Sequence, residues 1–266
     1  MGGRLSHVAL RVATAVVLGF IYVPLVIIGL YAFSEARALA WPITGLTLRW
    51  WDEAFADPDL WDALGTSFQA AAGATAIALV LGSLAALAVQ RYRFFGRETI
   101  SFVVILPIAL PGIVTGMALN STFRTFGVDL SLFTIIVGHA TFCVVIVYNN
   151  VIARLRRSSR SIEEASMDLG ADTWQTFRYV TFPVVRTALL AGGLLAFALS
   201  FDEVIVTTFT TGGEQTVPIY ILKLLSRQPS PVVNVVAIIV IALSTIPVYI
   251  ATRLTSGSGT VAAGRA

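Results

Sequence analysis

The sequence has little charge. Only 12% of its 266 residues are charged, whereas 56% are hydrophobic, and the charged fraction is about half of what soluble domains carry. A soluble domain of this length needs a charged exterior, so the composition argues against a soluble enzyme and predicts a protein surrounded mainly by lipid. The formal net charge of +3 is too small to mark a nucleic-acid partner by itself.

The sequence also lacks the residues of common catalytic and metal sites. Cys143 is the one cysteine, which excludes an internal disulfide, and His7 and His139 are too far apart for a metal-binding spacing. The one lysine, Lys223, stands in YILKLL without a neighbouring glycine, so the chain has no P-loop. Patterns such as G-x-S-x-G and H-E-x-x-H are missing too. We therefore expect no enzymatic activity, no metal and no cofactor in this chain.

Long uncharged runs predict an all-α membrane protein. A membrane helix needs roughly 20 apolar residues, and we expect a single transmembrane domain over residues 1–255 and a flexible cytoplasmic tail over 256–266, which is rich in Gly, Ser and Ala. Arg186, near the start of the fifth run, is expected to snorkel to the interface. The six predicted spans are residues 12–33, 68–89, 99–123, 130–153, 184–203 and 232–252.

The first run has a second interpretation. Ala38-Leu39-Ala40 resembles a signal-peptidase site behind a basic leader. The uncharged run before it has 22 residues, however, and the apolar region of a signal peptide has about 7–15. We therefore expect a permanent helix.

The basic residues predict the orientation. If the N-terminus is cytoplasmic, 13 of the 18 basic residues fall on the cytoplasmic side, whereas the first outer loop collects six acidic residues. Cytoplasmic loops carry an excess of Lys and Arg. We expect both termini in the cytoplasm and a multi-pass protein of a bacterial inner membrane.

The long loop between the fourth and fifth spans, residues 158–183, predicts two short helices. Ser161 and Glu164 have the spacing of a capping box, and Gly170 suits the position just after a helix end.

The second of these helices has the same start signal. Asp172 and Gln175 repeat the capping spacing, and Pro183 is expected to end this helix and to open the fifth span. Periodicity alone would also allow a pair of amphipathic interfacial helices that only connect two spans.

The spacing within this loop resembles the EAA loop of ABC importer permeases, whose pattern is E-A-A, three residues, G, nine residues, I-x-L-P. Three positions depart from the pattern, with Ser for the third-position Ala, Val for Ile and Phe for Leu. The matching residues are Glu164-Ala165-Ser166, Gly170 and Val180-Thr181-Phe182-Pro183.

This resemblance implies the type I importer permease fold, with six helices and a cytoplasmic coupling helix that docks on an ATPase. It implies a homologous second permease, two ATPase subunits that bind ATP and Mg, and an extracytoplasmic substrate-binding protein. A docking turn has to be small because a partner backbone approaches it closely. The expected coupling residues are Glu164, Ala165, Ser166, Gly170, Ala171 and Pro183.

Two regions are candidates for a substrate path. The third span carries Pro107 and Pro111, which free backbone carbonyls where helices line a cavity. The fifth span ends at Phe201, Asp202 and Glu203. Carboxylates at the edge of the hydrocarbon layer are a site hypothesis, with a cation as their partner and the Phe201 ring as a cation-π contact. The alternative is that they only mark the outer helix end.

Four runs resemble the second permease subunit of spermidine/putrescine importers, which implies polyamine transport. Permeases for iron, thiamine, sulfate or an amino-acid-like amine share the scaffold and remain alternatives. An ion-coupled secondary transporter or a membrane-embedded enzyme would place polar groups at mid-span; we expect the mid-span His139 to be packed with a satisfied ring. The four runs are LTLRWWDEAF (46–55), FDEVIVTTF (201–209), TGGEQTVPIYIL (211–222) and PVVNVVA (231–237).

Overall fold

The structure is a computed structural model that describes residues 2–37, 40–226 and 230–256, with side chains from residue 7 to residue 246 within those ranges. Residues 257–266 of the predicted tail lie outside the described residues. The chain forms two compact units, Met1–Leu60 with Ile221–Leu243, and Trp61–Tyr220 with Ser244–Ala266. We call them the small and the large unit; the single domain over 1–255 stays a prediction.

The small unit contains α1 (Gly2–Tyr31), α2 (Arg49–Ala56), the end of α11 (Val217–Ser226) and the first half of α12 (Val232–Ser256). The Trp50 Nε1–H donates to the Ser34 carbonyl at 2.7 Å, which fixes α2 to the loop after α1. An ion pair of 3.1 Å joins Lys223 and Asp59.

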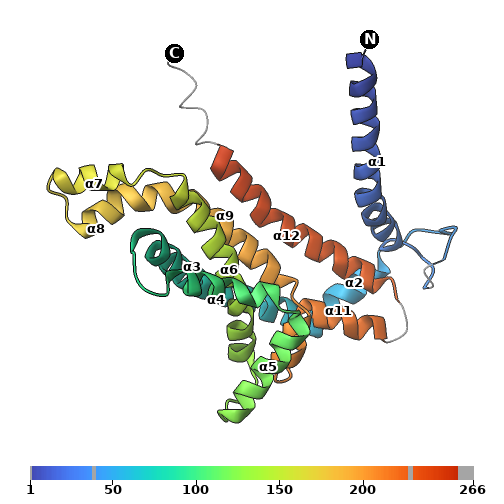
Figure 1. The fold of residues 1–266 in the computed structure, drawn as a ribbon. Coiled ribbons are helices and arrows are strands. Elements are labelled where there is room, and N and C mark those ends of the chain that lie inside the picture. The colour runs from blue at the N-terminus through green and yellow to red at the C-terminus, as the bar shows by residue number, and fades with distance from the viewer. Residues whose placement is uncertain (1, 38–39, 227–229, 257–266) are drawn as a thin grey trace. The chain divides into compact units, whose positions relative to one another are not determined.

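The large unit is built on α3 (Pro58–Arg91), α6 (Leu132–Arg156) and α9 (Phe182–Phe201) (Figure 1). Small residues let helices approach one another closely, and the second predicted span, residues 68–89 in α3, is rich in Ala and Gly. A Cβ atom on Gly82 would lie 2.8 Å from the Val144 carbonyl oxygen, and one on Gly192 would lie 3.3 Å from the Val147 Cα. Helix α6 thus serves as the central helix of this unit.

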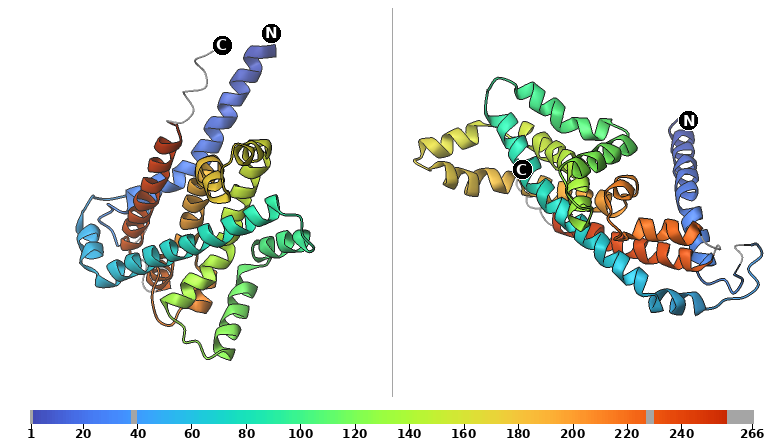
Figure 2. Two further views of the ribbon diagram at one scale, coloured as in Figure 1. Left: turned by 90° about the vertical axis from the view of Figure 1, so that its left-hand side faces the viewer. Right: turned by 90° about the horizontal axis from the view of Figure 1, so that it is seen from below.

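The third predicted span is not one continuous helix. It consists of α4 (Arg97–Ala109) and α5 (Gly112–Thr125), which meet at 106° (Figure 2, left). Pro107 stays inside α4, whereas Pro111 is the N-cap of α5. Proline disfavours the helical conformation of the residue before it, and Leu110 is extended, with ψ 144°. The sequence predicts a single span over residues 99–123, and the structure shows a break within it.

The fifth predicted span, 184–203, is also interrupted at its end. Helix α9 stops at Phe201, and a short helix, α10 (Ile205–Thr210), follows after three residues. The Thr134 Oγ1–H of α6 donates to the Thr210 carbonyl at 2.7 Å, so α10 is held within the large unit rather than extending from it.

Four helices of the described chain are long and apolar enough to cross a membrane, or five if α4 and α5 form one span. The described side chains of α12 end at Ile246, so the last predicted span, 232–252, runs past them. Six spans therefore stay a prediction.

A candidate coupling arm and two interrupted helices

Helices α7 (Ser161–Asp168) and α8 (Thr173–Thr176) form an arm at one end of the large unit, which we call the α7–α8 arm (Figure 1). Gly170, with φ +90°, makes the turn between them, and only glycine adopts this conformation without cost. The Gly170 N–H donates to the Met167 carbonyl at 2.9 Å, and the Ala171 N–H donates to the Ser166 carbonyl at 3.1 Å. These two bonds are the Schellman motif, so the position predicted for Gly170 is confirmed.

Of the two predicted capping boxes, the second is confirmed and the first is wrong. The Gln175 N–H donates to Asp172 Oδ1 at 2.8 Å, and the Asp172 N–H donates to Gln175 Oε1 at 2.9 Å. Ser161 instead lies inside the first turn of α7, whose N-cap is Arg160. Glu164 makes an ion pair of 3.1 Å with Arg160, so its carboxylate is used elsewhere.

The predicted end of the second helix at Pro183 is also wrong. Helix α8 continues through a π-helical turn, η1 (Phe177–Thr181), directly into α9. Pro183 stands in the first turn of α9, as predicted for the start of the span. Proline has no N–H to donate, and the Phe182 N–H next to it donates five residues back, to the Phe177 carbonyl. Helices α8 and α9 therefore form one continuous helical rod with a widened turn, and α7 joins this rod through the Gly170 turn.

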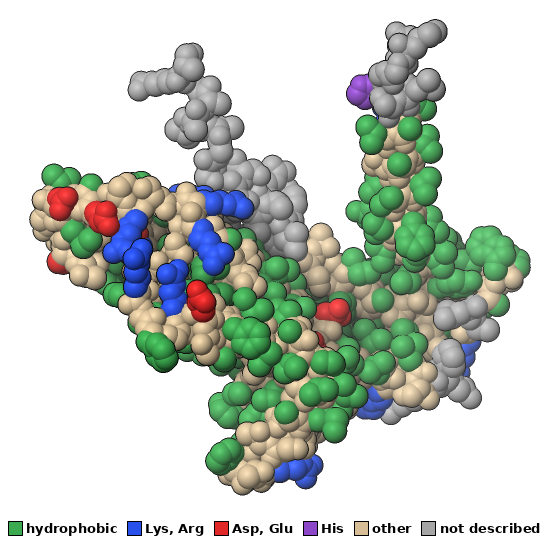
Figure 3. All heavy atoms as spheres, viewed as in Figure 1, with side chains coloured by type: hydrophobic (Ala, Val, Ile, Leu, Met, Phe, Trp, Pro, Cys, Tyr) green, Lys and Arg blue, Asp and Glu red, His purple; other side chains and the backbone are tan. Residues whose placement is uncertain are grey.

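The outer side of the arm exposes apolar side chains. Leu169, beside the Gly170 turn, is 90% exposed, and Trp174 is 67% exposed. Exposed apolar clusters rimmed by polar residues mark protein contacts. Figure 3 shows basic side chains gathered beside this arm. The exposed set is Ile162, Met167, Leu169 and Trp174.

The predicted coupling residues do not all face the same way. Glu164 and Ala165 are exposed, whereas Ser166 turns inward and its hydroxyl lies 3.2 Å from Thr176 Oγ1. Gly170 is exposed and Ala171 is half-buried. The surface open to a partner thus centres on the Gly170 turn.

The inner side of the arm carries a contact that sequence reasoning missed. Glu163 makes an ion pair with Arg91 at the end of α3, and Thr181 in η1 bonds to both side chains. Arg91 and Glu163 are 72 residues apart, and no local pattern pairs residues at that separation.

The two interrupted helices meet each other. A Cβ atom on Gly112, at the start of α5, would lie 3.7 Å from Ile205 Cγ2, at the start of α10. One turn further, a Cβ atom on Gly116 would lie 2.7 Å from the Phe209 ring. The Asn120 Nδ2–H donates to the Phe209 carbonyl at 2.5 Å. The structure therefore brings the break at Pro111 next to the break that follows Phe201, and paired broken helices form ion and substrate sites in membrane transporters.

Asp202 and Glu203 have different surroundings. Glu203 Oε1 accepts the Val206 N–H at 2.9 Å, so this carboxylate caps the first turn of α10. Asp202 is exposed at the end of α9. Phe201 is buried, and its ring stacks on Phe197 with centroids 6.0 Å apart. Of the three, Asp202 is the side chain open to a ligand.

Residues 78–257 match the family described as "Binding-protein-dependent transport system inner membrane component". The chain belongs to this family. It is 32% identical over 241 residues to the putrescine transport system permease protein PotI of Escherichia coli K12, covering 87% of this chain and 85% of PotI. It is 31% identical to the spermidine/putrescine transport system permease protein PotC of Haemophilus influenzae, covering 86% of this chain and 89% of PotC.

Solved structures show the same fold for this inner-membrane component. A bacterial ABC transporter that imports the acidic polysaccharide alginate matches with a TM-score of 0.71 and 20% identity, over 97% of both chains. The same kind of transporter, in complex with an alginate-bound periplasmic protein, matches with a TM-score of 0.72 and 16% identity, over 94% of this chain and 93% of that one. These likenesses establish the ABC importer permease fold.

The polar mid-span residue of this permease is packed as predicted. Both ring nitrogens of His139 have partners, Ser200 Oγ at 2.7 Å and Thr207 Oγ1 at 2.8 Å. The ring is fully buried. This observation confirms the expectation of a satisfied ring.

The large unit of the permease has a groove of about 340 Å³ beside the break of the third span. Pro107 lines it, together with Leu110, Val114 and Thr115. Pro111 is not among its lining residues, so the two prolines predicted for the path have different roles. Pro107 lines an apolar wall, and Pro111 sets the break.

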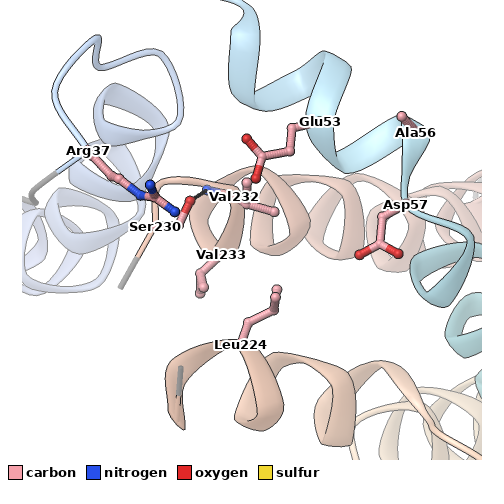
Figure 4. A pocket seen from close by; sticks show the side chains of 8 residues that line it. All are labelled: Arg37, Glu53, Ala56, Asp57, Leu224, Ser230, Val232 and Val233. Atoms are coloured by element: carbon pink, nitrogen blue, oxygen red, sulfur yellow. Dashed lines mark hydrogen bonds between the residues drawn. The ribbon is translucent and has the colours of Figure 1, made fainter. Parts of the chain in front are cut away.

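The small unit of the permease has a hollow of about 440 Å³ that is lined by charged side chains (Figure 4). Glu53 comes from α2, Asp57 follows that helix, and Arg37 comes from the loop after α1. Leu224 and Val233 complete the wall. The charged part of the lining thus consists of two carboxylates and one guanidinium.

Proposed function

We propose that this chain is one of two permease subunits of an ATP-driven polyamine importer of a bacterial inner membrane. The relatives named for putrescine and spermidine/putrescine transport, at 31–32% identity over 86–87% of this chain, carry the proposal. The interrupted helices of the large unit support a translocation path, and the α7–α8 arm supports a docking site for an ATPase.

The path is expected to prefer a cation. Helix α4 ends at Ala109 and α9 ends at Phe201, and the carbonyl end of a helix carries a partial negative charge. The exposed Asp202 carboxylate follows the end of α9. A protonated linear amine would pair with this carboxylate through a charge-assisted hydrogen bond. Glu203 keeps the turn in shape by capping α10, so it acts on the ligand indirectly.

The arm is expected to enter a groove of the ATPase with its Gly170 turn first. The turn is exposed and has no side chain, and Leu169 beside it is 90% exposed, so a partner can bury apolar surface without displacing a bulky group. Movement of the arm would pass into α9, because α8 and α9 form one helical rod. ATP and Mg would be bound by that partner.

The remaining parts of the importer follow from this role. We infer a second, homologous permease, two ATPase subunits and an extracytoplasmic substrate-binding protein. A solved structure of the same fold is in complex with a periplasmic protein, which supports the last partner. The basic residues beside the arm favour a cytoplasmic arm, and we infer cytoplasmic termini and six spans with it. In this arrangement the chain supplies half of the path and no catalytic group.

The substrate is tested by uptake into proteoliposomes that hold the complete importer. We expect labelled putrescine or spermidine to accumulate and unlabelled polyamine to compete, while sulfate, thiamine and iron do not. The relative named for 2-aminoethylphosphonate transport, at 28% identity, makes that compound the sharpest comparison, because it carries a negative group as well as an amine. Uptake of the phosphonate in preference to putrescine would overturn the polyamine assignment and leave the permease role intact.

A further inference from the structure

The α7–α8 arm has two consecutive glutamates, of which one is exposed and the other is shielded. Glu164 is 56% exposed and pairs with Arg160, which is 68% exposed. Glu163 is only 15% exposed and pairs with Arg91, which is 25% exposed. Exposed pairs on one helix contribute little, whereas a shielded pair between different elements holds those elements in register. The inward glutamate is therefore the one that ties the arm to the rest of the large unit.

Thr181 completes this contact. One Arg91 Nη donates to Thr181 Oγ1 at 2.9 Å, and the Thr181 hydroxyl donates to Glu163 Oε1 at 2.9 Å. Arg160 adds a bond of 3.5 Å to the Arg91 carbonyl. Each member comes from a different element, since Arg91 ends α3, Glu163 lies in α7 and Thr181 lies in the π-turn η1.

The connectivity of the chain gives this contact its importance. The arm is joined covalently to α6 before it and, through η1, to α9 after it. Helix α3 has no such link to the arm, because residues 92–160 separate them in the chain. Arg91 and Glu163 supply the link. The π-turn is a widened turn, and such turns are frequent at functional sites, so a contact that fixes Thr181 also fixes the geometry of the turn.

We propose that Arg91, Glu163 and Thr181 form a latch that positions the α7–α8 arm and transmits its displacement to α3 as well as to α9. This inference rests on the proposed function, in which the arm docks on an ATPase. These are positioning residues, since they are largely shielded and bond to one another, whereas the docking turn is exposed. Loss of the latch would leave docking and ATP hydrolysis in place but would release α3 from the movement.

The test uses the complete importer in proteoliposomes and measures polyamine molecules taken up per ATP hydrolysed. The variants are Glu163→Gln, Arg91→Gln and Thr181→Val. The matched control is Arg93→Gln, because Arg93 carries the same charge, lies two residues after Arg91 and is exposed. We expect the ratio to fall about fivefold or more in the latch variants, at the lower end of usual coupling strengths, and to stay unchanged in the control. ATPase co-purification should persist in all four.

The doubly exchanged Arg91→Glu/Glu163→Arg chain separates a latch from a general loss of structure, because it restores opposite charges at the same two positions. We expect it to recover a large part of the ratio that either single exchange loses. Thr181→Val keeps the ion pair and nearly the same volume, so it reports on the latch if a charge variant fails to assemble. An unchanged ratio in the assembled latch variants would overturn the latch alone, whereas a wild-type chain that binds no ATPase would overturn the proposed function with it.

Discussion

Thr207 Oγ1 lies 2.8 Å from His139 Nε2 and donates its hydrogen to the Glu203 carbonyl at 2.7 Å. The other ring nitrogen, Nδ1, lies 2.7 Å from Ser200 Oγ. A single chain of hydrogen bonds thus holds the ring through both of its nitrogens. It joins α6 to both sides of the break between α9 and α10.

Replacement of His139 should destabilise the permease. In His139→Leu the buried Ser200 hydroxyl loses its ring partner, and an unsatisfied buried group costs about 1–3 kcal/mol. We expect a lower unfolding temperature of the purified protein in detergent. Thr208→Val is the control, because Thr208 is exposed and bonds only within its own helix, to the Val204 carbonyl. Equal unfolding temperatures for His139→Leu and the control would contradict the structural role of the chain of hydrogen bonds.

Asp202 and Glu203 should respond differently to substitution. Glu203→Ala removes a cap from α10 and should cost about 0.5–2 kcal/mol of stability. Asp202→Asn should leave the unfolding temperature unchanged and raise the KM for putrescine about tenfold, which is the weight of one hydrogen bond to a charged group. Transport kinetics and thermal unfolding of both variants check this. Unaltered uptake by Asp202→Asn would remove that carboxylate from the path.

Two glycines one turn apart on α5 test the meeting of the interrupted helices. A Cβ atom on Gly116 would lie 2.7 Å from the Phe209 ring, and one on Gly112 only 3.7 Å from Ile205. Gly116→Ala should therefore force α5 and α10 apart and cost about 1–3 kcal/mol. Gly112→Ala should be tolerated. The unfolding temperatures of the two variants check this prediction. A lower unfolding temperature for Gly112→Ala than for Gly116→Ala would contradict the contact between α5 and α10.

Gly170 has a matched control within the large unit. Gly170 and Gly96 have φ values of +90° and +86°, and a Cβ atom on either would meet nothing within 4 Å. Aspartate at either position should cost about 1–2 kcal/mol of backbone strain. Only Gly170→Asp should also abolish co-purification of the ATPase, because only this turn is proposed to enter the partner. Retention of the ATPase by Gly170→Asp would contradict the proposed docking turn.

The sequence predicts well those features that depend on a few neighbouring residues. The uncharged run at 130–153 is found as α6, Leu132–Arg156. The capping box predicted at Asp172 and the turn predicted at Gly170 are confirmed. Each of their hydrogen bonds joins residues that are at most five positions apart in the chain. The capping box predicted at Ser161 is wrong because Ser159 Oγ accepts the Ser161 N–H at 3.3 Å, which is the donor that the box would give to Glu164.

The features that were missed depend on distant partners. Pro107 and Pro111 have the same local effect on a helix, yet the break occurs only at Pro111, where α5 turns to pack on Phe209. The pairing of Glu163 with Arg91 likewise needs the arrangement of α3 and α7 in space. Asp202 and Glu203 are alike in sequence, and only the position of α10 shows that Glu203 is a cap.

The most direct test of the central claim is the energy source of putrescine uptake. The complete importer is reconstituted with its binding protein outside the vesicles and ATP and Mg inside, and the proton gradient is collapsed with an uncoupler. An ATP-driven importer should show uptake that persists under these conditions, that stops without internal ATP, and that is lost with Gly170→Asp. Uptake that stops with the uncoupler, proceeds without ATP and ignores Gly170→Asp would contradict it.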